Sequence, residues 1–325
     1  MLEHITTFIQ AVRPSIPPTE PNPAVKYCEE LLPVLSALAS NFVKALPIQE
    51  RVCRCWRHMV LSYRTAMVPL LPTLAHDLST GFQASHEGCY LWATDAIVRE
   101  FSEGAEFVDQ TTSDAVYQFF EQQSVAFLRI LNELPPQDLP DVVEDFFRLL
   151  DDVLTFFAEK SIMSPLAEPI LSAAITGLTL QQLDPLISVL NYVRRLLGFG
   201  TPQRPYSSFS SPDDNSMTNP PEIQAAVKRL ALSQGETLVQ RILTGMMFTF
   251  PGDCFPDASG ALITLFKVLP QQTAAWIQGT VQMLPAGTVK PGEAERLMKG
   301  ISQNLADVEK RKIRTILQGK PSLCF

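Results

Sequence analysis

The chain has 325 residues, of which 46% are hydrophobic and 18% charged, so it is long enough to bury a large core. Its formal net charge of -8 disfavours general binding to nucleic acid or anionic membranes, and any affinity for phosphate must come from a local patch. Its six cysteines are scattered, which is typical of reduced thiols in the cytosol or nucleus. We expect no membrane insertion, because no apolar run approaches the roughly 20 residues that cross a bilayer. We also expect that Met1–Val12 is not a signal peptide, because its pattern is short and amphipathic.

The first part of the chain predicts short helices separated by proline-containing turns. Met1–Val12 has an amphipathic pattern, and the five prolines of Arg13–Pro23 prevent that helix from continuing. Asn22 can cap a helix that starts at the following proline and runs to about Phe42. After a short turn, Ile48–Ala66 is the next expected helix.

The rest of the chain continues in the same way, with apolar residues at helical spacing and no convincing strand. Gly198–Pro221 is rich in serine and proline and has no periodicity, so we expect a long mobile loop there. The further expected helices are Met67–Phe82, His86–Phe101, Ser113–Leu134 (capped by Ser113 or Asp114), Asp141–Lys160, Leu166–Leu178, Leu186–Leu197, Glu222–Phe250, Asp257–Leu269, Thr273–Leu284, Gly292–Ala306 and Asp307–Leu317.

These helices form pairs of about 40 residues, which is the period of HEAT-type repeats. In such arrays each hairpin buries its apolar face against its neighbours. We therefore predict an all-α HEAT-repeat superhelical solenoid, a single array over residues 1–325. A large all-α bundle is the alternative, because no exact sequence repeat is visible.

The stretch IQERVCRCWRHMVLSYRTA (Ile48–Ala66) combines a basic face with an apolar face. On a helical wheel Arg51, Arg54, Arg57 and Arg64 share an arc of roughly 140°. This arc is either a solvated surface that pairs with acidic neighbours or a site for phosphate groups along an extended peptide. Arginine suits the second use, since its planar fork of donors matches phosphate.

A second helix has the opposite character. Five of its carboxylates share an arc of about 120°, and the rest of the helix is apolar. This arc is either a solvated outer face or a site for a basic segment, and it could also attract the arginine face across a curved array. The carboxylates are Asp141, Glu144, Asp145, Asp151 and Asp152.

Other combinations of residues do not predict chemistry. Cys53 and Cys55 with His58 and His76 could suggest a metal site, but the two cysteines point about 160° apart on a helix and cannot share one ion. There is no glycine-rich phosphate loop and no hydrolase or metalloprotease motif. We therefore expect no catalytic residues, no metal and no cofactor, and a binding scaffold in place of an enzyme.

The residues around the arginine helix resemble the transportin-SR family of importin-β-type nuclear transport receptors. The proline-rich Val12–Pro21 is similar to fungal members, and Asp141–Phe157 resembles the next strongly patterned helix of the family. The resemblance covers the whole chain but only the C-terminal third of the family. Its most specific part, Glu50–Glu103, contains the R-x-C-R-C-W-R core Arg51–Arg57, the apolar helix Met67–Phe82, the segment His86–Leu91 and the pair Glu100–Phe101.

The resemblance implies a HEAT-repeat karyopherin that carries arginine–serine-rich or related RNA-binding proteins into the nucleus and releases them when Ran-GTP binds. It also implies contacts with nucleoporins, shuttling between cytoplasm and nucleus, and no direct DNA binding. The main Ran contacts would lie in the N-terminal repeats that this sequence does not match. The chain is then a fragment, the product of a truncated gene model or a separate short protein, and its first helix would expose a face meant for a preceding repeat.

The resemblance also implies that Arg51, Arg54, Arg57 and Arg64 grip phosphorylated serines of the cargo. The family has further cations just after this helix, whereas this chain reads MVPLLP there. Less phosphorylated, arginine-rich cargo could then use the acidic face of Asp141–Asp152. Replacing Arg51, Arg54 and Arg57 with Ala should cut phosphopeptide binding and barely change the melting temperature. The alternative function is a HEAT adaptor that binds a folded partner without a transport role.

Overall fold

The computed structural model describes residues 1–14, 20, 22–102, 105, 108–203, 218–285, 292, 296, 299 and 300. Within these residues the fold is all-α, as the sequence predicts, and the one extended pairing is an isolated bridge between Gln203 and Thr218. Short 3-10 segments (η) lie at Arg64–Leu70, Pro136–Asp138 and Gly252–Cys254. The α-helices are α1 (Leu2–Ala11), α2 (Pro23–Asn41), α3 (Leu46–Tyr63), α4 (Leu71–Ser85), α5 (Cys89–Glu100), α6 (Gln110–Glu133), α7 (Pro140–Phe156), α8 (Ala158–Met163), α9 (Ala167–Gly177), α10 (Leu183–Gly198), α11 (Pro221–Phe248), α12 (Phe255–Val268) and α13 (Pro270–Met283).

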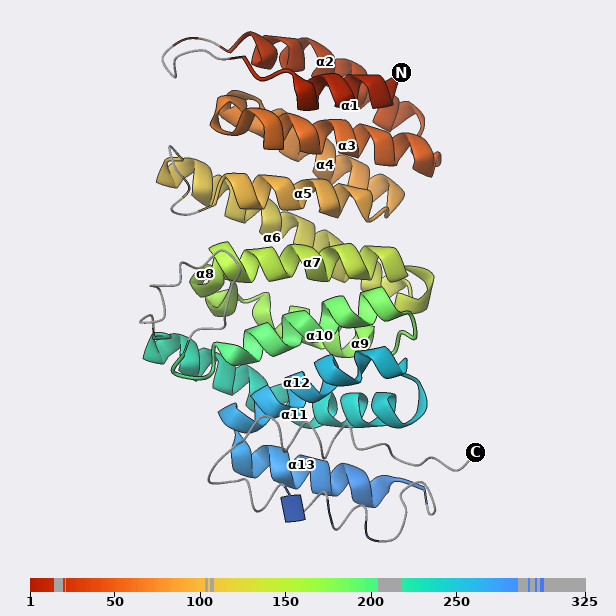
Figure 1. The fold of residues 1–325 in the computed structure, drawn as a ribbon, viewed down its shortest axis with the longest axis vertical. Coiled ribbons are helices and arrows are strands. Elements are labelled where there is room, and N and C mark those ends of the chain that lie inside the picture. Colours follow the sequence, from red (N-terminus) through yellow and green to blue (C-terminus); the bar gives the residue numbers. More distant parts are fainter. Residues whose placement is uncertain are drawn as a thin grey trace. The chain divides into compact units, whose positions relative to one another are not determined.

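The chain divides into two compact units, and each stacks its helices in two layers. Unit 1 comprises Met1–Pro135 and Asp141–Ala158; unit 2 comprises Pro136–Pro140 and Glu159–Phe325. In unit 1, α1, α3 and α5 lie side by side, and α2, α4 and α6 form the second layer (Figure 1). In unit 2, α10 packs on α12, while α9, α11 and α13 follow one another. This layering confirms the HEAT-type repeat fold, and the single array over residues 1–325 stays a prediction.

Local signals explain where several helices begin. The side chain of Asn22 accepts a hydrogen bond from the backbone N–H of Ala24 at 2.9 Å, and the first residue of α2 is a proline, as predicted. The start predicted for α6 was wrong. Its cap is Asp109, which accepts from the N–H of Thr112 at 2.7 Å, while Ser113 is buried inside the helix.

Three further predictions differ from the structure or lie outside it. The helix expected from Met67 begins at Leu71, because Pro69 lacks an N–H and restricts the residue before it, which favours the 3-10 segment Arg64–Leu70. The helix expected over Asp141–Lys160 is divided into α7 and α8. The centre of the predicted loop, residues 204–217, and most of the last two predicted helices lie outside the described residues.

The core of unit 1 contains one polar side chain that joins three helices. Gln49 of α3 is fully buried, and its Nε2 donates to the carbonyls of Ala39 at 2.9 Å and Phe42 at 2.6 Å, at the end of α2. Its Oε1 accepts from the hydroxyl of Tyr90 on α5. The ring of Tyr90 passes so close to Gly81 of α4 that a Cβ there would lie 2.0 Å from it.

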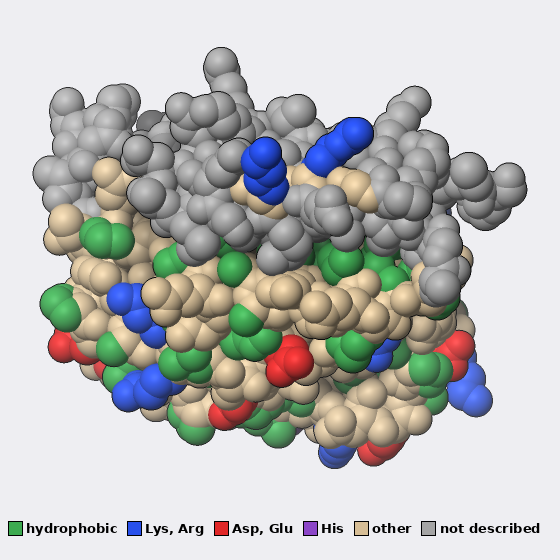
Figure 2. Space-filling view, turned by 90° about the horizontal axis from the view of Figure 1, so that it is seen from below, with side chains coloured by type: hydrophobic (Ala, Val, Ile, Leu, Met, Phe, Trp, Pro, Cys, Tyr) green, Lys and Arg blue, Asp and Glu red, His purple; other side chains and the backbone are tan. Residues whose placement is uncertain are grey.

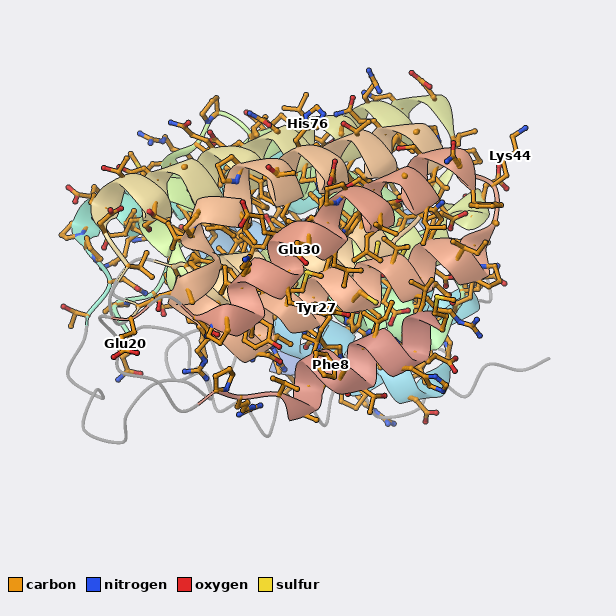
Figure 3. All side chains as sticks on the ribbon, turned by 90° about the horizontal axis from the view of Figure 1, so that it is seen from above. Phe8, Glu20, Tyr27, Glu30, Lys44 and His76 are labelled. Carbon is orange, nitrogen blue, oxygen red and sulfur yellow. The ribbon has the colours of Figure 1, made fainter. Side chains whose placement is uncertain are left out.

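Two aromatic side chains on the surface of unit 1 contact each other. In unit 1, Phe8 and Tyr27 lie edge to face with ring centroids 5.3 Å apart, and 48% and 36% of their surfaces are exposed (Figure 3). On the face drawn in Figure 2, the described Lys, Arg, Asp and Glu side chains are spread singly, with no gathered patch of either sign. Across the described residues, no helix combines the length and apolarity that a membrane span requires.

Candidate functional site

The apolar face of the arginine helix α3 is fully buried, as its pattern predicts. Val52, Cys53, Trp56 and Met59 have no exposed surface, and the indole of Trp56 lies 6.3 Å from the Tyr90 ring between centroids. This packing leaves the basic residues of α3 at the edges of the helix. Three of the four arginines pair with different acidic neighbours, and Arg54 pairs with none that the structure describes, so the four do not form one continuous row.

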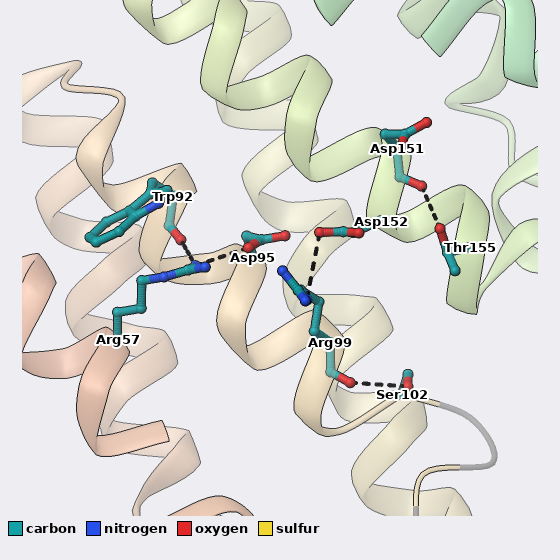
Figure 4. Close-up of polar contacts among 8 residues, drawn as sticks. All are labelled: Arg57, Trp92, Asp95, Arg99, Ser102, Asp151, Asp152 and Thr155. Atoms are coloured by element: carbon teal, nitrogen blue, oxygen red, sulfur yellow. Dashed lines mark hydrogen bonds and ion pairs between the residues drawn. The ribbon is translucent and has the colours of Figure 1, made fainter. Parts of the chain in front are cut away.

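Arg57 is the arginine whose environment departs most from the prediction. Its Nη1 donates to Asp95 Oδ2 at 2.9 Å and to the carbonyl of Trp92 at 2.5 Å. Its guanidinium lies 4.5 Å from the centroid of the Trp92 ring, a cation–π geometry. Only 12% of the Arg57 side chain is exposed, so it is a structural group of the α3–α5 interface (Figure 4).

Arg64 also lies outside the predicted arc, because α3 ends at Tyr63. The backbone φ of Arg64 is 45°, in the left-handed region that residues other than glycine rarely adopt. Its Nε contacts Glu100 Oε2 on α5 at 3.3 Å, and 72% of its side chain stays exposed. The helical wheel that placed it beside Arg57 was therefore wrong at this position.

The two remaining arginines face solvent. Arg51 Nη2 contacts Glu3 Oε1 on α1 at 3.2 Å, with both side chains more than half exposed. Arg54 is exposed and forms no ion pair with any residue that the structure describes. His58 lies beside them against Gln10, and burial, followed by the charges of Arg57 and Arg54, lowers the pKa of its imidazole. His58 therefore adds no charge to the basic surface at neutral pH.

The acidic helix α7 does not present five open carboxylates. Asp141 is exposed, but Glu144 is 17% exposed and pairs with Arg148 at 2.6 Å one turn along the helix. Burial, then the charge of Glu144, raises the pKa of Asp145 to about 7. A carboxyl that holds a proton near neutrality attracts basic groups weakly, so the predicted basic-cargo face is smaller than the sequence suggests.

The arginine helix and the acidic helix are linked through α5, which lies between them. Arg57 of α3 pairs with Asp95 of α5. One turn after Asp95 on the same helix, Arg99 has its Nε 3.9 Å from Oδ2 of Asp152 on α7 (Figure 4). The carboxyl of Asp95 lies close enough to Asp152 to raise the pKa of the Asp152 carboxyl. Charged groups of α3, α5 and α7 are therefore linked through α5, and among the described residues no arginine of α3 pairs directly with a carboxylate of α7.

The centre of this network holds a proton. Burial, then the hydrogen bond with Asp95, raises the pKa of Asp152 to about 8, although the Arg99 charge opposes the shift. Asp95 Oδ1 is buried and accepts no hydrogen bond from an amide, a guanidinium or a hydroxyl. Protonation of Asp152 avoids two adjacent carboxylates.

The sequence analysis gave no pairing role to Asp95 or Arg99, although these α5 residues link the arginine helix to the acidic helix. One local signal was available, since Asp95 and Arg99 are four residues apart on one helix face. Within the described part of the chain, no group of three or more His, Cys, Asp and Glu side chains could hold a metal ion.

Comparison with known proteins places this geometry in context. A search of solved structures matches a chain described as importin-13 in its cytosolic state, with a TM-score of 0.76 and 14% identity over 98% of this chain and 33% of the other. The fold is importin-like. Residues 22–127, which include α3 and α5, match the family model described as the Transportin-3/Importin-13 fourth TPR domain.

Curated relatives extend the similarity along the chain. A Schizosaccharomyces pombe protein described as uncharacterized is 29% identical over 98% of this chain and 33% of its own length. The mRNA transport regulator MTR10 of Saccharomyces cerevisiae is 24% identical over 82% of this chain and 28% of its own length. Transportin MOS14 of Arabidopsis thaliana is 16% identical over 78% and 24%. The chain thus spans between about a quarter and a third of the length of the curated relatives it matches.

Proposed function

We propose that this chain is the cargo-binding portion of a nuclear import receptor of the fungal transportin-SR kind. Support comes from the similarity to relatives named as an mRNA transport regulator and as a transportin. The proposed cargo is an arginine–serine-rich or related RNA-binding protein. Release by Ran-GTP, contact with nucleoporins and shuttling through the nuclear pore belong to the same proposal, with the main Ran contacts in repeats beyond this third.

The proposed cargo site is a reduced version of the arginine row. Arg54 is the central phosphate-binding residue of the proposal, because it is exposed and forms no ion pair among the described residues. Arg51 and Arg64 flank it and keep 53% and 72% of their side chains exposed, so a phosphate can compete for them. Arg57 is a positioning residue, since its donors are used by Asp95 and the Trp92 carbonyl.

Binding would then proceed by charge-assisted hydrogen bonds between phosphoserine oxygens and guanidinium groups. On the acidic side, Asp141 is exposed and remains available to a cargo arginine. Asp145 and Asp152 are poor candidates, because both carboxyls hold protons near neutral pH. A cargo with alternating phosphoserine and arginine suits the basic surface better than the acidic one.

The test is the affinity of a phosphorylated arginine–serine peptide, measured by fluorescence anisotropy at low salt. Replacing Arg54 with Ala should weaken binding roughly 5- to 30-fold, the effect of losing about 1–2 kcal/mol of charged hydrogen bonding. The matched control is Arg241→Ala, an exposed arginine of α11 in unit 2. Equal affinities of the Arg54 variant and the wild type would remove the proposed site.

One feature of unit 2 favours the alternative, an adaptor that binds a folded protein. An open hollow of about 370 Å³ lies between α8–α9 and α11, with Ile162, Met163 and Leu230 in its lining. A hydrophobic contact there should depend weakly on salt, whereas capture of a charged peptide should weaken steeply between 50 and 500 mM. The salt dependence of cargo binding therefore separates the two functions.

A further inference from the structure

The partner of Arg51 is placed by the way α1 packs on α3. The Thr6 hydroxyl lies 3.1 Å from the Sγ of Cys55, and the same thiol donates to the carbonyl of Leu2 at 3.6 Å. These contacts fix the register of the two helices, and they bring Glu3 beside Arg51, which lies one turn before Cys55 on α3. Glu3 Oε1 is then 3.2 Å from Arg51 Nη2. The pairing is therefore a consequence of the packing of α1.

Arg64 has its partner on α5, the other neighbour of α3 in this layer (Figure 1). The nearly buried pair of Arg57 and Asp95 fixes the register of α3 against α5. Both helices end soon after this pair, and Glu100 is the last residue of α5. Its Oε2 lies 3.3 Å from Arg64 Nε. Two exposed arginines are thus occupied by carboxylates from two different helices, whereas Arg54 has no such partner among the described residues.

The geometry of these two pairs allows an anion to open them. Their N–O distances of 3.2 and 3.3 Å exceed the roughly 2.7–2.9 Å of strong charge-assisted hydrogen bonds. Arg51 and Glu3 are both more than half exposed, so a displaced Glu3 carboxylate returns to water at little cost. Only 21% of the Glu100 side chain is exposed, so its separation from Arg64 leaves a less hydrated carboxylate and costs more.

We propose, resting on the cargo site proposed above, that Glu3 and Glu100 compete with phosphate for the basic surface and lower its affinity for phosphoserine. The first phosphate binds at Arg54, where no described carboxylate has to be displaced. A further phosphate replaces Glu3 at Arg51 or Glu100 at Arg64. The exchange favours phosphate, because phosphoserine carries a charge of about −1.5 to −2 and three acceptor oxygens, whereas a carboxylate carries one charge and two oxygens. The two carboxylates therefore limit the affinity for cargo and keep its binding reversible.

The test compares the affinity of the phosphorylated arginine–serine peptide for the wild type, Glu3→Gln and Glu100→Gln, by fluorescence anisotropy at low salt. Gln keeps the size of the side chain and removes its charge. Each substitution should tighten binding by about 2- to 5-fold, the strength of an exposed ion pair, with the larger gain for Glu100→Gln. The control is Glu50→Gln, which removes an exposed carboxylate that adjoins Arg51 in the sequence and forms no ion pair with a described residue. This control measures the general effect of one negative charge fewer and should give a smaller gain.

A double-mutant cycle shows whether each gain requires the ion pair. In an Arg51→Ala background, Glu3→Gln should give no more gain than the control, and Glu100→Gln should behave likewise with Arg64→Ala. A carboxylate whose Gln variant binds no more tightly than the control, or whose gain survives the loss of its arginine, is not a competitor. That result overturns this inference and leaves the cargo site in place, provided that Arg54→Ala still weakens binding. A wild type that does not bind the peptide overturns the proposed function as well.

Discussion

In unit 1 a nearly buried ion pair links two neighbouring helices in addition to their apolar packing, whereas the described ion pair between α10 and α12 of unit 2 is more exposed. In unit 1, Arg57, Asp95, Asp152 and Arg99 alternate through the interfaces of α3, α5 and α7. In unit 2, the indole of Trp276 on α13 covers Gly235 of α11 so closely that a Cβ there would lie 2.5 Å from it. The same helical-hairpin architecture thus contains two kinds of helix–helix interface. Their stabilities should respond differently to substitution and to pH.

The titration of the two units differs accordingly. In unit 1, the carboxyls of Asp145 and Asp152 have pKa values raised to about 7 and 8. In unit 2, burial raises the pKa of the Cys254 thiol to about 11 and that of the Tyr192 phenol, and both groups stay protonated near neutrality. Among the described groups with shifted pKa values, those that titrate near pH 7 belong to unit 1.

The largest expected effect is the loss of Arg57. Replacing it with Ala leaves the Asp95 carboxylate, only 13% exposed, without its cation, and should lower the free energy of unfolding by about 3 kcal/mol. Urea denaturation measures this. The sequence analysis expects that Ala at positions 51, 54 and 57 barely changes the melting temperature. We now expect a lower melting temperature from the substitution of Arg57 and little change from those of Arg51 and Arg54.

The matched substitution in unit 2 is Arg194→Ala. Arg194 lies 3.7 Å from Asp257, with side-chain exposures of 44% and 25%, so its loss should cost less than about 1 kcal/mol. Adding Asp95→Ala to the Arg57 variant should restore part of the lost stability, because the stranded charge is removed. Equal losses for Arg57→Ala and Arg194→Ala would end the contrast between the two units.

A steric substitution gives the next largest effect. Gly81→Ala places a Cβ 2.0 Å from the Tyr90 ring, which is fully buried, and should destabilise unit 1 by about 2 kcal/mol. Gly235→Ala should cost less in a thermal melt, because Trp276 is partly exposed and its ring can move outward. Gly279→Ala is the control. Nothing lies within 4 Å of its Cβ, so this helical position should gain up to about 1 kcal/mol.

A change of one pH unit is expected to change the free energy of unfolding less than the substitutions above. The folded chain keeps the proton of Asp152 up to about pH 8, whereas the unfolded chain loses it near its ordinary pKa of about 4. Stability should therefore fall as pH rises between these values, by at most about 1.4 kcal/mol per pH unit for this group. The groups that face Asp152 are Asp95, Arg99 and Asp151.

Asp152→Asn isolates this contribution. Its amide can still donate to Asp95 but does not titrate, so the difference between wild-type and variant unfolding free energies should change steadily from pH 5 to pH 8. Urea titrations at four pH values measure it. A difference that is constant across this range would show that Asp152 is ionised throughout and that the network holds no proton.

Sequence reasoning succeeded where the signal was local. The Asn22–Pro23 start and the apolar face of α3 depend on residues within one or two turns, and both were predicted correctly. Arg57 and Arg64 were misplaced because their surroundings are set by α5, about 35 residues away, and by the end of α3 at Tyr63. A helical wheel assigns a direction to a side chain, but only the neighbouring helix decides whether that direction meets water or a carboxylate.

The buried Gln49 has a consequence for the order in which unit 1 assembles. Its amide satisfies two carbonyls at the end of α2, and its own oxygen is satisfied by Tyr90 of α5. Neither the end of α2 nor the start of α5 can be lost without stranding a buried polar group, which costs about 1–3 kcal/mol. The two hairpins should therefore open in one step, so amide hydrogens at the end of α2 and in α5 should exchange with solvent at a common rate.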